Sequence, residues 1–295
     1  MLDVVLAPAE SLVAGTDVPG GITLRQGGSA ANAARWLARL GARTTLIAAV
    51  GRDPVGRALV KAVQSDGVTA RVARLAGERS GRIGVFVAPS GERSFVADRG
   101  AADLLKPAAL ETGWFKRASL LHLPAYSLIG ETLGAAGRRA IQLTRKAGGT
   151  VSVDLASTGP LLARGRPAAV ALIKDAGADL LFATAAEAEA LLGHGRLEAL
   201  LELAPVAVVK RGARGATVMA LEDGTRLRFE VATRHLRATD TTGAGDAFDA
   251  GFIVDWLTSR SKGRSLRASL QAAALAGHRA AARHLRTAQP ELPLG

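Results

Sequence analysis

Apolar and polar positions along this chain fall into two alternating patterns. Short apolar runs typical of buried strands alternate with longer segments in which apolar residues recur every three or four positions, as on one face of a helix. Such alternation is typical of a parallel sheet covered by helices. The predicted strands are residues 44–50, 69–75, 82–88, 93–97, 120–123, 150–154, 180–182, 206–209, 215–220 and 226–231. The predicted helices are residues 29–40, 55–65, 131–146, 185–192, 198–203, 245–260 and 265–285.

The spacing of these segments predicts one α/β domain over residues 1–295, because no low-complexity linker or internal repeat interrupts it. Pro89-Ser90-Gly91-Glu92 separates two of the predicted strands and predicts a hairpin turn. Residues of approximately 8–25 and 82–97 are therefore expected to form a small accessory β-sheet beside the main one.

Composition narrows the class of protein. The chain of 295 residues is 48% hydrophobic and has no cysteine, so disulfides, thiolate metal sites and cysteine nucleophiles are excluded. No window approaches the roughly 18 apolar residues of a membrane span, and no secretory signal is visible. We expect a cytoplasmic protein that does not bind membranes.

The formal net charge of +12 raises the question of a nucleic-acid partner. The arginines are scattered along nearly every segment, no basic run is interleaved with aromatic residues, and aromatics make up only 4% of the chain. Nucleic-acid binding is therefore not expected.

The segment Asp240-Thr241-Thr242-Gly243-Ala244-Gly245-Asp246 carries the clearest chemical signal. It places a glycine-rich turn and two acids at the start of a strongly apolar helical segment. A helix N-terminus binds anions through its free N–H groups, and glycine lets the backbone approach the anion closely. Asp246 then lies beside that anion, where phosphoryl transfer needs a base for the attacking hydroxyl. The alternative is that Asp246 merely caps the helix.

A second glycine-led helix start, Gly27-Gly28-Ser29-Ala30-Ala31-Asn32, lies far upstream. Alone it is a weak signal, equally consistent with a loop before an alanine-rich core helix. Together with the Asp240–Asp246 segment, it resembles the ribokinase-like (PfkB) carbohydrate kinase family. The resemblance covers essentially the whole chain and extends through residues 38–42, 50–56, 91–93 and 99–101.

This resemblance implies a ribokinase-like three-layer α/β sandwich with a mostly parallel central sheet and an accessory β-sheet lid. It also implies ATP-dependent phosphorylation of a hydroxymethyl group on a sugar or sugar-like compound. Asp246 matches the catalytic base of the family, and Gly243, Ala244 and Gly245 match its anion hole. Substrate-contacting positions are matched by Gly27, Gly28, Asn32 and Asp3.

The resemblance further assigns cofactor positions. The loop Lys210-Arg211-Gly212-Ala213-Arg214-Gly215 matches the nucleotide-binding loop, with Lys210 and Gly212 near the phosphates and ribose. The alternative for Lys210 is a solvated strand end. Asp240 matches the residue near a monovalent cation such as K⁺, although a single acid there is also typical of a turn.

Three positions depart from the family pattern. Thr184-Ala185-Ala186-Glu187 stands where the family has Asn-x-x-Glu, which organises Mg²⁺, so Glu187 is retained and Thr184 replaces the asparagine. Met1 to Val5 matches the end of the first strand of the family, so the strand is expected to be clipped, with Asp3 either binding sugar or lying on the surface. His278 replaces an asparagine near the adenine, where it either contacts the base or faces solvent.

Two weaker candidates and two alternative functions remain open. Asp154 ends a buried strand, where α/β proteins bind ligands, and His122 is expected to be a satisfied core residue. A nucleoside kinase of the same fold fits the same motifs, as does a catalytically weak ligand-sensing protein on this scaffold. By analogy with the family, a homodimer through the lid is expected.

Overall fold

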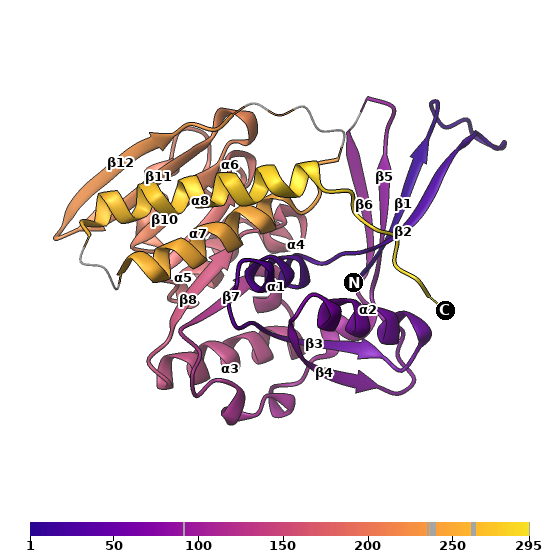
Figure 1. Ribbon diagram of the computed structural model, residues 1–295, viewed down its shortest axis with the longest axis horizontal. Coiled ribbons are helices and arrows are strands. Elements are labelled where there is room, and N and C mark those ends of the chain that lie inside the picture. Colours follow the sequence, from indigo (N-terminus) through magenta and orange to yellow (C-terminus); the bar gives the residue numbers. More distant parts are fainter. Residues whose placement is uncertain (91, 235, 237–239, 261–263, 295) are drawn as a thin grey trace. The chain divides into compact units, whose positions relative to one another are not determined.

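The computed structural model of the protein describes residues 1–294 except 91, 235, 237–239 and 261–263 (Figure 1). Gly91, part of the predicted hairpin turn, lies outside the described residues. The chain divides into two compact units. The first comprises Met1–Leu105, Arg237–Ala247 and Ala282–Gly295, and the second comprises Lys106–Leu236 and Phe248–Ala281.

The first unit contains a four-stranded sheet in the order β2-β1-β5-β6. Its strands are β1 (Leu2–Pro8), β2 (Gly20–Gln26), β5 (Arg82–Val87) and β6 (Arg93–Asp98). β1 pairs with β2 in antiparallel and with β5 in parallel orientation, so it is a central strand. Residues 2–7 lie outside the accessory sheet that the sequence predicts, which covers approximately residues 8–25 and 82–97. They join it because both edges of β1 are paired and Leu2 packs against the helix that begins at Pro54.

Two helices and a parallel strand pair complete this unit. The helices are α1 (Ser29–Arg39) and α2 (Pro54–Ser65), and the strands are β3 (Thr45–Gly51) and β4 (Thr69–Leu75), followed by a 3₁₀ turn at Gly100–Leu104. Asp53 caps α2, because its carboxylate accepts the N–H of Gly56 at 2.7 Å and Pro54 needs no partner at the first helical position. Near the C-terminus, the Leu292 N–H donates to the Leu24 carbonyl at 2.7 Å.

The second unit is built on a six-stranded sheet in the order β12-β11-β10-β9-β8-β7. Strands β7 to β10 are parallel, whereas β11 and β12 are antiparallel to their neighbours. The strands are β7 (Leu120–Pro124), β8 (Thr150–Asp154), β9 (Leu180–Thr184), β10 (Val206–Lys210), β11 (Ala216–Glu222) and β12 (Thr225–Val231). Its helices are α3 (Thr132–Lys146), α4 (Thr158–Leu162), α5 (Arg166–Asp175) and α6 (Ala185–Leu192), with 3₁₀ turns at 107–109, 112–114, 125–128, 197–202 and 212–214.

Helices cover both faces of this sheet. Leu181 and Ala183 of β9 belong to a buried cluster with residues of α5 and α6. Phe182 points to the opposite face and packs edge-on against Phe252, with the two ring centroids 5.3 Å apart. Phe252 belongs to α7 (Ala244–Arg260), which with α8 (Leu266–Arg286) contributes to both units. The mostly parallel sheet between helical layers and the separate smaller sheet confirm the predicted α/β fold class. Helices α4 and α5 were not predicted; Pro167 lies in the first turn of α5, where proline is tolerated.

Candidate active site

The N-terminus of α7 lies in the first unit and has a tightly specified backbone. Gly243 has φ +82°, and a Cβ added there would lie 3.1 Å from Cε1 of His284, so both conformation and space require glycine. The Ala244 N–H donates to the Thr241 carbonyl at 3.2 Å, and α7 then begins. Asp246 is in its first turn and 9% exposed. The dipole of α7 at this N-terminus favours an anion.

Asn32 of α1 holds the carboxylate of Asp246. Its Nδ2 donates to Oδ2 of Asp246 at 2.9 Å, although the two residues lie 214 positions apart in the chain. Gly28, with φ +93°, is the N-cap residue of α1 and turns the chain so that Asn32 falls in the first turn of that helix. The structure therefore brings together the two motifs that carried the family resemblance.

Asp3 lies in the same unit and is only 7% exposed. A Cβ on Gly27 would lie 1.9 Å from its Oδ1, so the carboxylate packs directly against the glycine backbone. Burial raises the pKa of Asp3 to about 6, although the N-terminal ammonium and Arg25 oppose the rise. Its Oδ1 has no hydrogen-bond partner among the residues that the structure describes. Because Asp3 is buried, the interpretation of Asp3 as a surface residue is wrong. A buried acceptor without a partner is costly unless a ligand satisfies it.

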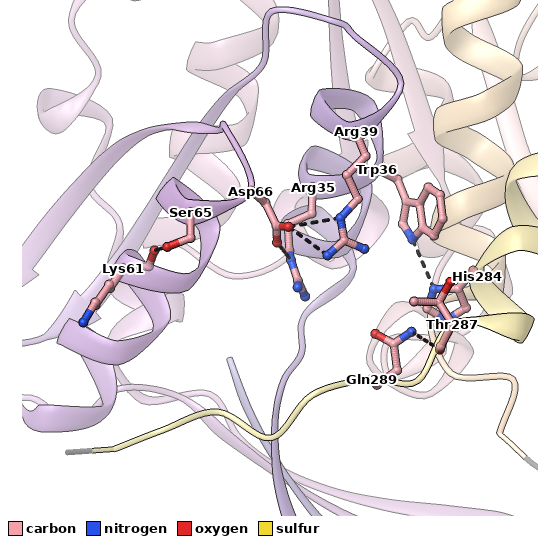
Figure 2. A network of polar contacts seen from close by, with 9 residues as sticks. All are labelled: Arg35, Trp36, Arg39, Lys61, Ser65, Asp66, His284, Thr287 and Gln289. Carbon is pink, nitrogen blue, oxygen red and sulfur yellow. Dashed lines mark hydrogen bonds and ion pairs between the residues drawn. The ribbon is translucent and has the colours of Figure 1, made fainter.

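A cavity of about 670 Å³ opens within the first unit, and its lining includes Asp3, Asn32 and Thr242. A volume of this size suits a small-molecule ligand. One wall of the cavity contains two basic residues, Arg35 and Arg39 of α1. Both bind the carboxylate of Asp66, as Figure 2 shows, and Nη2 of Arg39 lies 2.8 Å from Asp66 Oδ1. Burial would raise the pKa of Asp66, but the bonds and charges of the two arginines outweigh it and lower the pKa.

Asp240 is bound by two arginines of the four-stranded sheet. Arg25 of β2 donates to its Oδ2, and Nη2 of Arg93 of β6 lies 2.9 Å from its Oδ1. Burial would raise the pKa of Asp240, but the hydrogen bond from the Thr242 N–H, together with Arg93 and Arg25, lowers it. The turn interpretation of Asp240 holds as well, because that N–H donates to Oδ1 at 2.9 Å. Neither arginine is predicted at this place from the sequence, since nothing in the spacing of the strands aligns them with residue 240.

Lys210, expected at the nucleotide loop, is buried within the second unit. Its Nζ lies 3.2 Å from Asp154 Oδ1 and 3.0 Å from Asp249 Oδ2, and its side chain is only 10% exposed. Burial alone would lower the pKa of Lys210, but the two carboxylates outweigh it and raise the pKa. The reading of Lys210 as a solvated strand end is therefore wrong. Asp249 was missed, although an acid inside an otherwise apolar helix signals a buried partner.

Thr184 and Glu187 form a capping box at the start of α6. The Thr184 N–H donates to Glu187 Oε2 at 2.7 Å, and the Glu187 N–H donates to Thr184 Oγ1 at 3.2 Å. Thr184 thus fills an N-cap role that asparagine also fills. Burial raises the pKa of Glu187. Within the described ranges no group of three or more histidine or acidic side chains could hold a metal.

The remaining predicted residues of the second unit have structural partners. Gly212 and Gly215 have φ angles of +56° and +87° and shape the turn after β10. The Arg211 N–H closes this turn by donating to the Gly215 carbonyl at 2.8 Å. His278 bonds the Val231 carbonyl through Nε2 at 3.1 Å and packs against Phe248, so the solvent-facing reading is wrong. His122 lies 2.9 Å from Ser152 Oγ through Nδ1, but its buried Nε2 has no hydrogen-bond partner among the described residues, so the expectation of a satisfied core residue is only half right.

A comparison with known families now bears on this geometry. The description "pfkB family carbohydrate kinase" matches residues 2–290. The chain belongs to the pfkB family of carbohydrate kinases. This confirms the family resemblance and the interpretation of the protein as an ATP-dependent kinase of sugars or related small molecules.

Similar proteins span several substrates. The ATP-dependent ribose-1-phosphate kinase of Halopiger xanaduensis is 33% identical over 267 residues, 89% of this pfkB chain and 83% of its own. Adenosine kinase from Sinorhizobium meliloti superposes with a TM-score of 0.80 at 24% identity, covering 100% of this chain and 94% of that one. Fructokinase from Vibrio cholerae, solved with fructose, ADP and calcium, superposes with a TM-score of 0.78 at 22% identity, covering 99% of this chain and 93% of that one. The two structures share the fold. No helix in the described part of the chain has the length and apolar character to cross a bilayer.

Proposed function

We propose that this pfkB kinase transfers the γ-phosphoryl group of ATP to a hydroxymethyl group, with Asp246 as the general base. One observation carries the proposal: Asp246 is buried in the first turn of α7, oriented by Asn32, directly after a glycine turn. A base held next to an anion-binding helix end is the arrangement that phosphoryl transfer needs. We treat residues 1–295 as one catalytic domain with residues 8–25 and 82–97 as its lid.

In the proposed reaction, the substrate hydroxyl gives its proton to Asp246 as its oxygen attacks the γ-phosphorus and the bond to ADP breaks. The backbone turn of Gly243, Ala244 and Gly245 is the proposed anion hole, where the helix dipole stabilises charge on the transferring group. Mg²⁺, when bound, would neutralise phosphate charge, and Glu187 and Thr184 are the residues proposed to hold it, partly through water. The nucleotide roles of Lys210, Gly212, Gly215 and His278 stay predictions.

The substrate side is proposed at Asp3, Gly27, Gly28 and Asn32. The buried Oδ1 of Asp3 lacks a partner among described residues, which supports a hydroxyl donor from a sugar. Fructose, adenosine and ribose 1-phosphate, named with the similar proteins, keep both sugars and nucleosides open. A nucleoside kinase is the close alternative, and a ligand sensor without turnover is the distant one.

The test is ADP release against a panel of sugars, sugar phosphates and nucleosides. Loss of the base in Asp246→Asn should lower kcat by about 10²–10⁴-fold, with KM little changed. Asp223→Asn is the matched control, because Asp223 is exposed in the β11–β12 turn and asparagine tolerates its φ of +48°. Turnover that survives in Asp246→Asn rules out this base. A panel compound that raises the melting temperature without any turnover favours the sensor.

A homodimer through the four-stranded sheet is proposed from its exposed apolar side chains. Ile22 of β2 is 69% exposed, and Phe95 and Val96 of β6 are 60% and 78% exposed. The three side chains lie on the two edge strands of the sheet, Phe95 and Val96 on opposite faces, and exposed apolar side chains favour an interface. Val96→Glu should shift the protein from dimer to monomer in light scattering, and a wild-type monomer rejects the proposal. The cytoplasmic location stays a prediction.

A further inference from the structure

Both carboxylate oxygens of Asp240 have donors of the protein as partners. Oδ2 accepts from Nη1 of Arg25, while Oδ1 receives the Thr242 N–H at 2.9 Å and lies 2.9 Å from Nη2 of Arg93. Arg93 also donates through Nη1 to the Thr241 hydroxyl at 3.2 Å. The arginine side chains are 28% and 14% exposed, so solvent screens them only partly.

The backbone carbonyl of Thr242, two residues on, is also occupied. Nε2 of His284, in the last turn of α8, lies 2.6 Å from this oxygen. On the other side of the ring, the indole N–H of Trp36 donates to Nδ1 at 3.1 Å, a bond drawn in Figure 2. Indole is only a donor, so Nδ1 must be the acceptor and Nε2 must carry the proton given to Thr242. Burial lowers the pKa of His284, which keeps the ring in this neutral form.

These contacts do not suit the monovalent cation that the family resemblance implies at Asp240. Such a cation needs several oxygen atoms with free lone pairs, but the carboxylate and the Thr242 carbonyl here face guanidinium and imidazole N–H groups. Two positive charges already surround one carboxylate. A further cation at this place would have to displace an arginine or lie beside both.

We infer that Arg25, Arg93 and His284 take the place of a monovalent cation and hold the Asp240–Gly243 turn in its active shape. Gly243, packed against His284, leads directly into the first turn of α7 and Asp246. The three residues are positioning residues: they act through the turn on the anion hole and the base. Because Arg25 and Arg93 lie on β2 and β6, the four-stranded sheet is tied to the turn that precedes the base. This inference rests on the proposed kinase activity.

The first arm of the test uses the wild-type protein in buffers of K⁺, Na⁺ or tetramethylammonium at equal ionic strength. We expect turnover to vary by less than about twofold and the melting temperature to be the same in all three. A rise in melting temperature specific to K⁺, as a bound ion would produce, overturns the inference even if no substrate is turned over. Absent turnover with cation-independent melting counts against the proposed function alone.

The second arm uses variants. Arg25→Ala with Arg93→Ala should lower kcat by about tenfold or more, and added guanidinium should restore part of it. Arg79→Ala is the control, because Arg79 is 71% exposed and pairs with Asp98 at the surface. His284→Phe should lower kcat, whereas His284→Gln, which keeps an amide donor, should retain more of it. Unchanged kcat in the double arginine variant and in His284→Phe overturns the inference.

Discussion

Substituting Lys210 by methionine tests the interior of the second unit. Methionine nearly matches the length of lysine but carries no charge. It would leave Asp249, whose side chain is 0% exposed, and Asp154, at 6%, as adjacent buried carboxylates. At an effective dielectric constant of about 20, each contact of about 3 Å contributes about 5 kcal/mol before desolvation is subtracted.

The net effect is smaller than these Coulomb energies, because burying the three charges also costs solvation. Removing one partner of a buried pair costs about 3–5 kcal/mol, a large part of the stability of an ordinary protein. Lys210→Met with Asp249→Asn should recover part of the loss, because one carboxylate charge is removed with the lysine. The two substitutions should therefore be strongly non-additive.

The measurement is chemical denaturation combined with hydrogen exchange of peptides spanning β9 and β10. Hydrogen exchange reads the second unit by itself, which matters because a chain of two compact units need not unfold in one step. A Lys210→Met variant that is destabilised by less than about 1 kcal/mol would show that the lysine is not paired in the interior. Loss of ATP affinity without loss of stability would instead place Lys210 at the nucleotide.

Two further predictions concern the first unit. The pKa of Asp3 rises from 3.8 unfolded to about 6 folded, so the folded state binds the proton more tightly and stability falls as pH rises from about 4 to about 6. Asp3→Asn should therefore be more stable than wild type at pH 8, by up to about 3 kcal/mol, but not at pH 3, in urea titrations at both pH values; an equal difference at both pH values contradicts this. Gly243→Ala should abolish most turnover, whereas Gly224→Ala, at φ +79° in open space, should cost only about 1–2 kcal/mol of stability. Equal turnover of the two alanine variants would show that the contact of Gly243 with His284 does not matter.

Local patterns determined most strands, most helices and the family motifs. Apolar runs such as Val206–Val209 must be buried wherever they occur, and a glycine turn before an apolar helix is recognisable from neighbouring residues alone. The positions of Asp246 and Asn32 could therefore be named as site residues from the sequence. The membership of β1 in the accessory sheet could not, because strand pairing depends on residues 82–86, far along the chain.

The partners of the charged residues were decided by the tertiary structure. The sequence alone does not say whether Asp240 lies beside a metal ion, a water or an arginine, and only the fold aligns it with Arg25 and Arg93. His284 contacts Trp36, although 248 residues separate the two in the sequence. Lys210 contacts Asp249 only because α7 packs against the sheet that contains β10. Sequence patterns indicate which side chains must be buried, because the tendency to be buried depends on the apolar character of each residue. Pairing depends on two residues and on the fold between them, so it is settled only when the chain has folded.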